Sequence, residues 1–170
     1  MAEELKLYEQ GLEEYPKVGI VLNNLVVILW ITLGTIVCWF FHPLVGWAFL
    51  ALAIIMIYGV LRKLVCTNCY YYDRWCPMGW GKLCALLFRE GDIERFDAGP
   101  GMRVGSLTYG FLGAVPLILV VISILQEFSS PKIVVLGLLS LTLAYMGVIS
   151  RKKNCERCKV RFICPGSAAK

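Results

Sequence analysis

Two cysteine motifs of the same form lie far apart in the sequence, and their thiols could bind a metal ion. Each motif has two cysteines separated by two residues, then a third cysteine that proline follows directly. The motif cysteines are Cys66, Cys69, Cys76, Cys155, Cys158 and Cys164. In a C-x2-C turn two thiolates can bind one ion while backbone amides point at the sulfurs, and two turns supply the four thiolates of a tetrahedral zinc or iron site. Two such turns in matched positions indicate a metal site far more specifically than one.

The ligands can be divided between sites in two ways. In one, the first two cysteines of both motifs close a shared site, and the third cysteines form a second pair. In the other, each motif has its own centre, with Cys84 as the fourth ligand of the first and a non-cysteine ligand in the second. Short linkers at 64–65 and 153–154 hold each turn within about 10 Å of its helix end. We therefore expect the first two cysteines of both motifs to reach one metal-sized volume.

Three chemistries suit these cysteines. A Cys-Pro at the end of a cysteine series occurs in iron–sulfur ligation and also in zinc sites, and reversible thiol chemistry remains a further alternative. Stable disulfides are disfavoured if the motifs face a reducing compartment. A structural zinc gives no obvious reason for a site placed against a bilayer, and location therefore favours an iron–sulfur centre. Cys38, within a long apolar run, is expected to be a packed hydrophobic residue instead.

The rest of the sequence predicts an integral membrane protein. Of the 170 residues 58% are hydrophobic and only 17% are charged, whereas a soluble domain has about 25% charged residues. Four apolar runs, at 18–41, 44–61, 104–125 and 133–149, have lengths suited to a bilayer and contain no Asp, Glu, Lys or Arg. The second and fourth are near the lower limit of length, so little tilt is expected there.

Basic residues predict the orientation of these helices. Seven Lys and Arg lie in residues 62–103 and seven more in residues 151–170, against Lys132 alone in the two opposite turns. Positive residues favour the cytoplasmic side of a membrane. We therefore expect both termini, the central loop and both cysteine motifs to be cytoplasmic, with the lipid bilayer around the helices.

An internal repeat relates the two halves of the chain. Arg62 and Arg151, the lysines after them, and the first two cysteines of the motifs are each separated by 89 positions, and the third cysteines by 88. The predicted fold is therefore an all-α membrane protein with four transmembrane helices, arranged as two parallel-repeat hairpins that each end in a cytoplasmic cysteine motif. The predicted divisions are an N-terminal segment at 1–17, the first unit at 18–81, an interfacial linker at 82–103 and the second unit at 104–170. Residues 82–88 of the linker are expected to form a short amphipathic helix at the membrane interface.

Several functions are disfavoured by what the sequence lacks. The only histidine, His42, has no partner to ligate a membrane haem, and no phosphate loop or hydrolase motif is present. The net charge of +5 reflects basic residues beside apolar runs, so nucleic acid is not an expected partner. A self-sufficient enzyme is not expected. The chain is predicted to be an electron-transfer or membrane-anchor subunit with a cytoplasmic redox partner, or a zinc-stapled scaffold for a protein partner; either could form a homo-oligomer.

Overall fold

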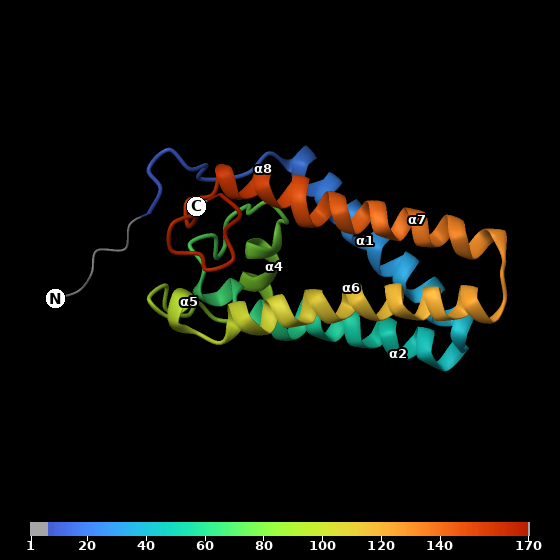
Figure 1. The fold of residues 1–170 in the computed structure, drawn as a ribbon. Helices are drawn as coiled ribbons and strands as arrows, with labels where there is room; N and C mark the ends of the chain where they lie inside the picture. Colours follow the sequence, from blue (N-terminus) through green and yellow to red (C-terminus); the bar gives the residue numbers. More distant parts are fainter. Residues whose placement is uncertain (1–6, 170) are drawn as a thin grey trace.

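The computed structural model describes residues 7–169, except the side chains of residues 97 and 98, and this part of the chain is helical without a named strand (Figure 1). Its elements are α1 (Lys17–Phe41), α2 (Pro43–Ile54), the π-helix η1 (Ile55–Val60), α3 (Leu61–Leu64), the 3-10 helix η2 (Cys66–Asn68), α4 (Trp80–Leu87), α5 (Arg95–Ala98), α6 (Gly101–Gln126), α7 (Ser130–Ala144), the π-helix η3 (Tyr145–Ser150) and α8 (Arg151–Glu156).

Four helical stretches are long and apolar enough to cross a membrane, which confirms the predicted spans. They are Lys17–Phe41, Pro43–Asn68, Gly101–Gln126 and Ser130–Glu156. The second and fourth helices extend beyond the apolar runs at 44–61 and 133–149, and the small tilt expected of these runs stays a prediction. Lys and Arg are good helix formers whose alkyl stems lie along apolar surface, and the helices therefore continue through the basic residues toward the cysteines.

Both hairpins are closed by tight turns in which a proline lies in the first turn of the second helix. His42 precedes α2, and its side chain accepts a hydrogen bond from the amide of Leu44. Proline is favoured at this place because its fixed φ suits a helix and its missing amide has no partner there. Pro43 and Pro131 occupy matching places in α2 and α7.

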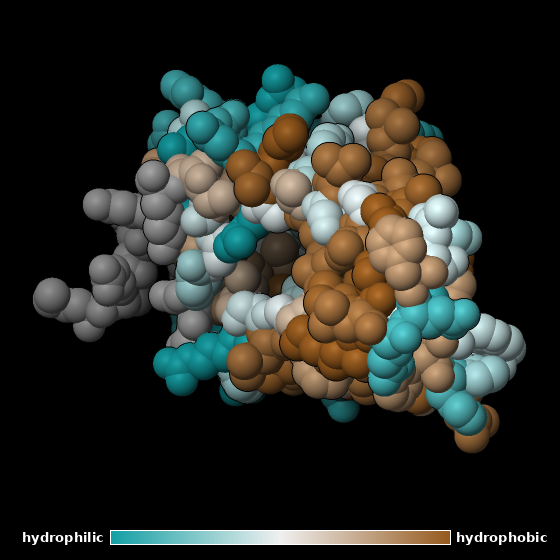
Figure 2. All heavy atoms as spheres, turned by 45° about the vertical axis from the view of Figure 1, so that its right-hand side comes forward, coloured by the Kyte–Doolittle hydropathy of each residue, from teal (hydrophilic) through white to brown (hydrophobic). Residues whose placement is uncertain are grey.

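Helix α1 is the centre of the bundle, since it packs against α2, α6 and α7. The buried core consists mainly of apolar side chains of these four helices, among them Val27, Trp30, Leu33, Val37, Phe49, Leu112, Val120 and Leu139. Outside the core the helices expose apolar side chains over much of the bundle surface (Figure 2). Helix α7 is the most peripheral and buries only Leu139 and Thr142. An apolar exterior of this kind suits a lipid surrounding.

Both cysteine motifs lie at one end of the bundle, here called the motif end, and both hairpin turns lie at the other (Figure 1). The two hairpins start from the motif end and therefore run in the same sense. Each second helix also has a six-residue π-helix before its basic residues, η1 in one copy and η3 in the other. These likenesses agree with a duplication, which stays a prediction. The helix expected near residues 82–88 is present as α4.

Candidate metal centre

The first cysteine motif begins where the second membrane helix ends. Cys66 opens the short helix η2, and its carbonyl accepts a hydrogen bond from the amide of Cys69 at 3.4 Å. The carbonyl of Cys69 then accepts from the amide of Tyr72 at 2.9 Å. Two successive turns thus carry the chain around the second cysteine. The amide of Tyr71 hydrogen-bonds the Cys69 sulfur inside this turn.

The second motif repeats this backbone pattern. The carbonyl of Cys155, in α8, accepts from the amide of Cys158 at 3.2 Å, and the carbonyl of Cys158 accepts from Arg161 at 3.2 Å. The amide of Val160, two residues after the second cysteine, hydrogen-bonds the Cys158 sulfur. In both motifs an amide at the same position therefore points at the sulfur of the second cysteine, which is the local geometry expected of a turn that binds a metal.

The third cysteines are held by different surroundings. The Cys76 sulfur accepts a hydrogen bond from the Trp80 amide at 3.1 Å, at the start of α4. Asn23 and Asn24 of α1 donate their side-chain amides to the carbonyls of Pro77 and Met78 at 2.8 and 2.9 Å. Cys164 lies in the C-terminal turn, where its amide donates to Val160 at 2.8 Å.

The two motifs meet around Tyr71. This side chain is 2% exposed and packs with Tyr15 and Ile20, and both Cys69 and Cys158 pack against the same cluster. The Tyr71 hydroxyl accepts from the amide of Lys159 at 3.1 Å, in the second motif. The second cysteines of the two motifs are thus neighbours, although 89 positions separate them in the sequence.

The other predicted ligands divide between the two halves. Cys66, Cys76 and the buried Cys84 interact electrostatically with one another, and Cys158 does so with Cys155 and Cys164. Among residues 7–169, no group of three or more Cys, His, Asp or Glu side chains is arranged so as to hold a metal ion. Which cysteines share a centre therefore stays a prediction. Cys38 is fully buried within α1, as expected of a packed residue.

Burial holds three thiols of this region, those of Cys69, Cys84 and Cys158, in their neutral form. Burial raises the pKa of Cys158 to about 11, even though the Val160 amide acts in the opposite direction. Burial likewise raises the pKa of Cys84 to about 11, and that of Cys69 above its ordinary range. A metal ion binds the thiolate and displaces the proton, so these positions suit a metal ligand better than a free nucleophile.

The burial of Arg62 is a feature that the sequence did not predict, because a basic residue at the end of a membrane helix indicates only orientation. The Arg62 side chain is 0% exposed. The guanidinium lies 3.1 Å from the ring centroid of Trp80 and 5.3 Å from that of Tyr58, and its Nη1 donates to the Cys66 sulfur at 3.6 Å. The Nε and Nη2 atoms are buried without a hydrogen-bond partner.

The N-terminal segment also contributes to this region, which the sequence did not indicate. Leu12 forms a parallel bridge with Cys158, and its carbonyl accepts from the Tyr71 hydroxyl at 2.6 Å. Tyr15 donates its backbone amide to the carbonyl of Trp75 at 2.8 Å and its hydroxyl to the carbonyl of Asn154 at 2.8 Å. One short segment therefore bonds to the loop and to the tail, and holds both motifs together.

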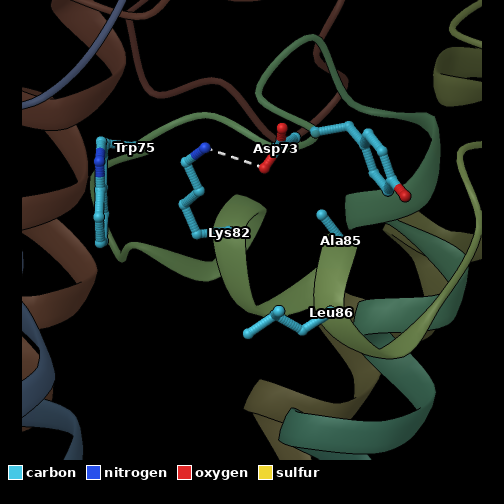
Figure 3. A pocket seen from close by; sticks show the side chains of 6 residues that line it. Asp73, Trp75, Lys82, Ala85 and Leu86 are labelled. Carbon is cyan, nitrogen blue, oxygen red and sulfur yellow. Dashed lines mark hydrogen bonds and ion pairs between the residues drawn. The ribbon is translucent and has the colours of Figure 1, made fainter.

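A cleft of about 620 Å³ opens beside the first motif, between the loop before α4 and α4 itself (Figure 3). Lys82 and Asp73 form an ion pair of 2.9 Å across it, and Trp75 and Leu86 line it. None of its six lining residues is a cysteine. The cleft is therefore separate from the candidate metal centre.

Comparison with known proteins identifies no relative of this chain: no protein-family model, no curated protein and no solved structure matches it.

Proposed function

We propose that this chain is an integral membrane metal-binding protein whose motif cysteines bind one or two iron–sulfur centres, and that it serves as an electron-transfer or membrane-anchor subunit. An iron–sulfur centre would be held by thiolates of Cys66, Cys69 and Cys76 in the first motif and of Cys155, Cys158 and Cys164 in the second. When bound, such a centre supplies one-electron transfer. The protein supplies the thiolates, the hydrogen bonds to sulfur and a position beside the membrane.

One observation carries this proposal. In each motif the amide two residues after the second cysteine hydrogen-bonds the sulfur of that cysteine, from Tyr71 to Cys69 and from Val160 to Cys158. Hydrogen bonds to ligand sulfurs stabilise the bound thiolate and tune the reduction potential of iron–sulfur centres. A buried cysteine that had only a packing role would not need this geometry at the same position of two separate motifs.

The place of the motifs favours a redox role over a purely structural one. Both lie at the same end of the helices, where a soluble or membrane partner could approach. The positive-residue bias favours the cytoplasmic side for this end. An impermeant maleimide added to intact cells should leave Cys155 and the other motif cysteines unlabelled, and should label them once the membrane is opened and a chelator and denaturant have released the metal and exposed the thiols. Strong labelling from outside would reverse the orientation.

Metal analysis of protein purified without oxygen tests the proposal. We expect iron and acid-labile sulfide in comparable amounts, broad visible absorption that bleaches on reduction, and a loss of both on replacing Cys66 or Cys155 by Ser. The control, Cys38→Ser, should keep the wild-type metal content, because Cys38 lies inside the helical core. A colourless protein without iron, which also fails to take up iron and sulfide on reconstitution, would refute the proposal.

A zinc-stapled scaffold is the second candidate, and a separate observation favours it. The loop, the tail and the N-terminal segment are joined through Tyr71, whose hydroxyl bonds both Leu12 and Lys159. A metal at this place would fasten three separate parts of the chain, as structural zinc does. In the same analysis, stoichiometric zinc in a colourless protein would select this candidate over the first.

A further inference from the structure

We infer that the first motif and Cys84 form one four-cysteine metal site of their own, and that the buried Arg62 is its counter-cation. The inference rests on the proposed metal-binding function and specifies its ligands. The four thiolates would come from Cys66, Cys69, Cys76 and Cys84. The second motif would then contribute to a separate centre, as in the second of the two ligand divisions described above.

The charge of Arg62 requires an anion that the free protein does not provide. Arginine stays protonated in proteins, and an unpaired charge in the interior is costly. The described part of the chain has four ion pairs, none of which includes Arg62. The guanidinium interacts electrostatically with Cys66, Tyr109, Cys76 and Cys84, and these groups are neutral until they lose a proton.

A four-thiolate site provides that anion. Four thiolates carry twice the charge of a divalent ion, so a zinc tetrathiolate keeps a net negative charge. Metal binding releases the thiol protons to solvent and leaves the anionic complex beside the guanidinium. Arg62 already donates a hydrogen bond to the Cys66 sulfur at 3.6 Å. Its Nε and Nη2 atoms have no hydrogen-bond partner, and each could donate to a further sulfur.

Cys84 belongs to this group by position. Its side chain is 0% exposed, it comes from α4, and its thiol lies 3.6 Å from the carbonyl oxygen of Arg62. It interacts electrostatically with Cys66 and Cys76 as well as with Arg62. Cys69 interacts with Cys66 and Cys76, and also with Cys158 of the second motif. A single stretch of chain, from 62 to 84, thus supplies four cysteines and one guanidinium. Because no three potential ligands of residues 7–169 are already arranged to hold an ion, the sulfurs would close around the ion as it binds.

The second copy offers a matched control. Arg151 also stands four residues before the first cysteine of its motif, but it is exposed, and its guanidinium donates to the carbonyl of Gly166 at 2.6 and 3.2 Å. A counter-cation role therefore predicts different results for the same substitution at the two arginines.

The first test measures metal content. Full-length wild type and the variants Cys66→Ser, Cys84→Ser, Cys66→Ser/Cys84→Ser and Cys38→Ser are loaded in detergent with Zn²⁺, or with ferrous iron and sulfide. We expect the two single variants to lose the same share of metal, the double variant to lose no more, and Cys38→Ser to lose none. Wild-type metal content in Cys84→Ser, with a loss in Cys66→Ser, would overturn the ligand set.

The second test measures the charge. Zn²⁺ affinity is determined by competition with a chelator, and melting temperature is measured with and without Zn²⁺. For Arg62→Met we expect at least tenfold weaker binding at the first site, together with a metal-free melting temperature above that of the wild type, because the unpaired charge is gone. Arg62→Lys keeps a charge and should lie between the two. Arg151→Met should bind as the wild type does.

The outcomes separate the inference from the function on which it rests. Unchanged Zn²⁺ affinity in Arg62→Met would overturn the counter-cation role. If the melting temperature were also lower with and without metal, the side chain of Arg62 would contribute packing alone. A wild-type protein that binds neither Zn²⁺ nor iron with sulfide would overturn the proposed function and this inference with it.

Discussion

Arg62 and Arg151 stand at equivalent positions of two similar motifs, and their surroundings are opposite. Arg62 is completely buried between Trp80 and the first-motif cysteines, whereas Arg151 is exposed and bonds a carbonyl of the tail. Helix α4, which follows the first motif, supplies Trp80 and Cys84, and the described part of the tail, up to residue 169, contains no counterpart of it. Two motifs with similar cysteine spacing thus have different environments, because the segment that follows each motif differs. We therefore expect substitutions around α4 to affect the first motif far more than the second.

The largest effect is expected at Gly81, in the first turn of α4. A Cβ at this position would overlap the carbonyl oxygens of Tyr71 and Arg74. Both are backbone atoms, so the loop of the first motif or α4 itself would have to move. Gly81→Ala should cost about 3 kcal/mol of stability in an SDS unfolding titration, and should release metal from the first motif while the second keeps its share.

Gly147→Ala is the matched control in the other copy. A Cβ at Gly147 would meet no atom within 4 Å, and the added methyl group should leave stability and metal content as in the wild type. If Gly81→Ala were as stable as Gly147→Ala, the close packing of α4 on the first motif would be wrong.

A smaller effect is expected where the two motifs are joined. Tyr71→Phe removes the hydroxyl that donates to the Leu12 carbonyl and accepts from the Lys159 amide. Two part-buried backbone groups would be left without this partner, at a cost of about 1–3 kcal/mol. Hydrogen exchange should therefore speed up in the N-terminal segment and in the tail around Lys159.

The neighbouring Tyr72→Phe is the control for this prediction. The Tyr72 hydroxyl donates to the carbonyl of Phe88 at 2.9 Å, near the end of α4, and it bonds neither the tail nor the N-terminal segment. Equal exchange rates in the tail of the two variants would argue against Tyr71 as the link between the motifs.

The sequence predicted the membrane helices, the two motifs and α4, because each depends on a local pattern of apolar residues or cysteines. The burial of Arg62 could not be predicted in this way, since an arginine at the end of a membrane helix also serves to orient it. The role of Tyr71 and Leu12 depends on contacts between segments more than 50 residues apart. Two asparagines in an apolar helix, Asn23 and Asn24, were a usable signal for a loop packed on α1.

The smallest effect is expected at Glu13, whose carboxylate joins both motifs. It pairs with Lys159 of the second motif at 3.0 Å and Arg74 of the first at 3.6 Å. The hydrogen bond and charge of Lys159, and then the charge of Arg74, hold the pKa of Glu13 below its ordinary value. Because the pKa is lowered in the folded protein, its stabilising effect is present above the unfolded pKa and disappears as the pH falls through the folded value.

Glu13→Gln should therefore speed hydrogen exchange in the tail slightly at neutral pH and low salt. The difference from the wild type should shrink with added salt, since the pairs are exposed, and should disappear in acid once Glu13 is protonated. A difference that persisted in acid would assign the effect to something other than the ion pairs.

X-ray absorption at the metal edge tests the central claim, that the cysteines bind a metal, most directly. The measurement uses wild-type protein purified without oxygen and reports the atoms around the bound metal. We predict a shell of sulfur atoms, at about 2.3 Å if the metal is zinc, with fewer sulfurs per chain in Cys66→Ser and an unchanged shell in Cys38→Ser. A shell of only nitrogen and oxygen, or protein without metal, would contradict the claim.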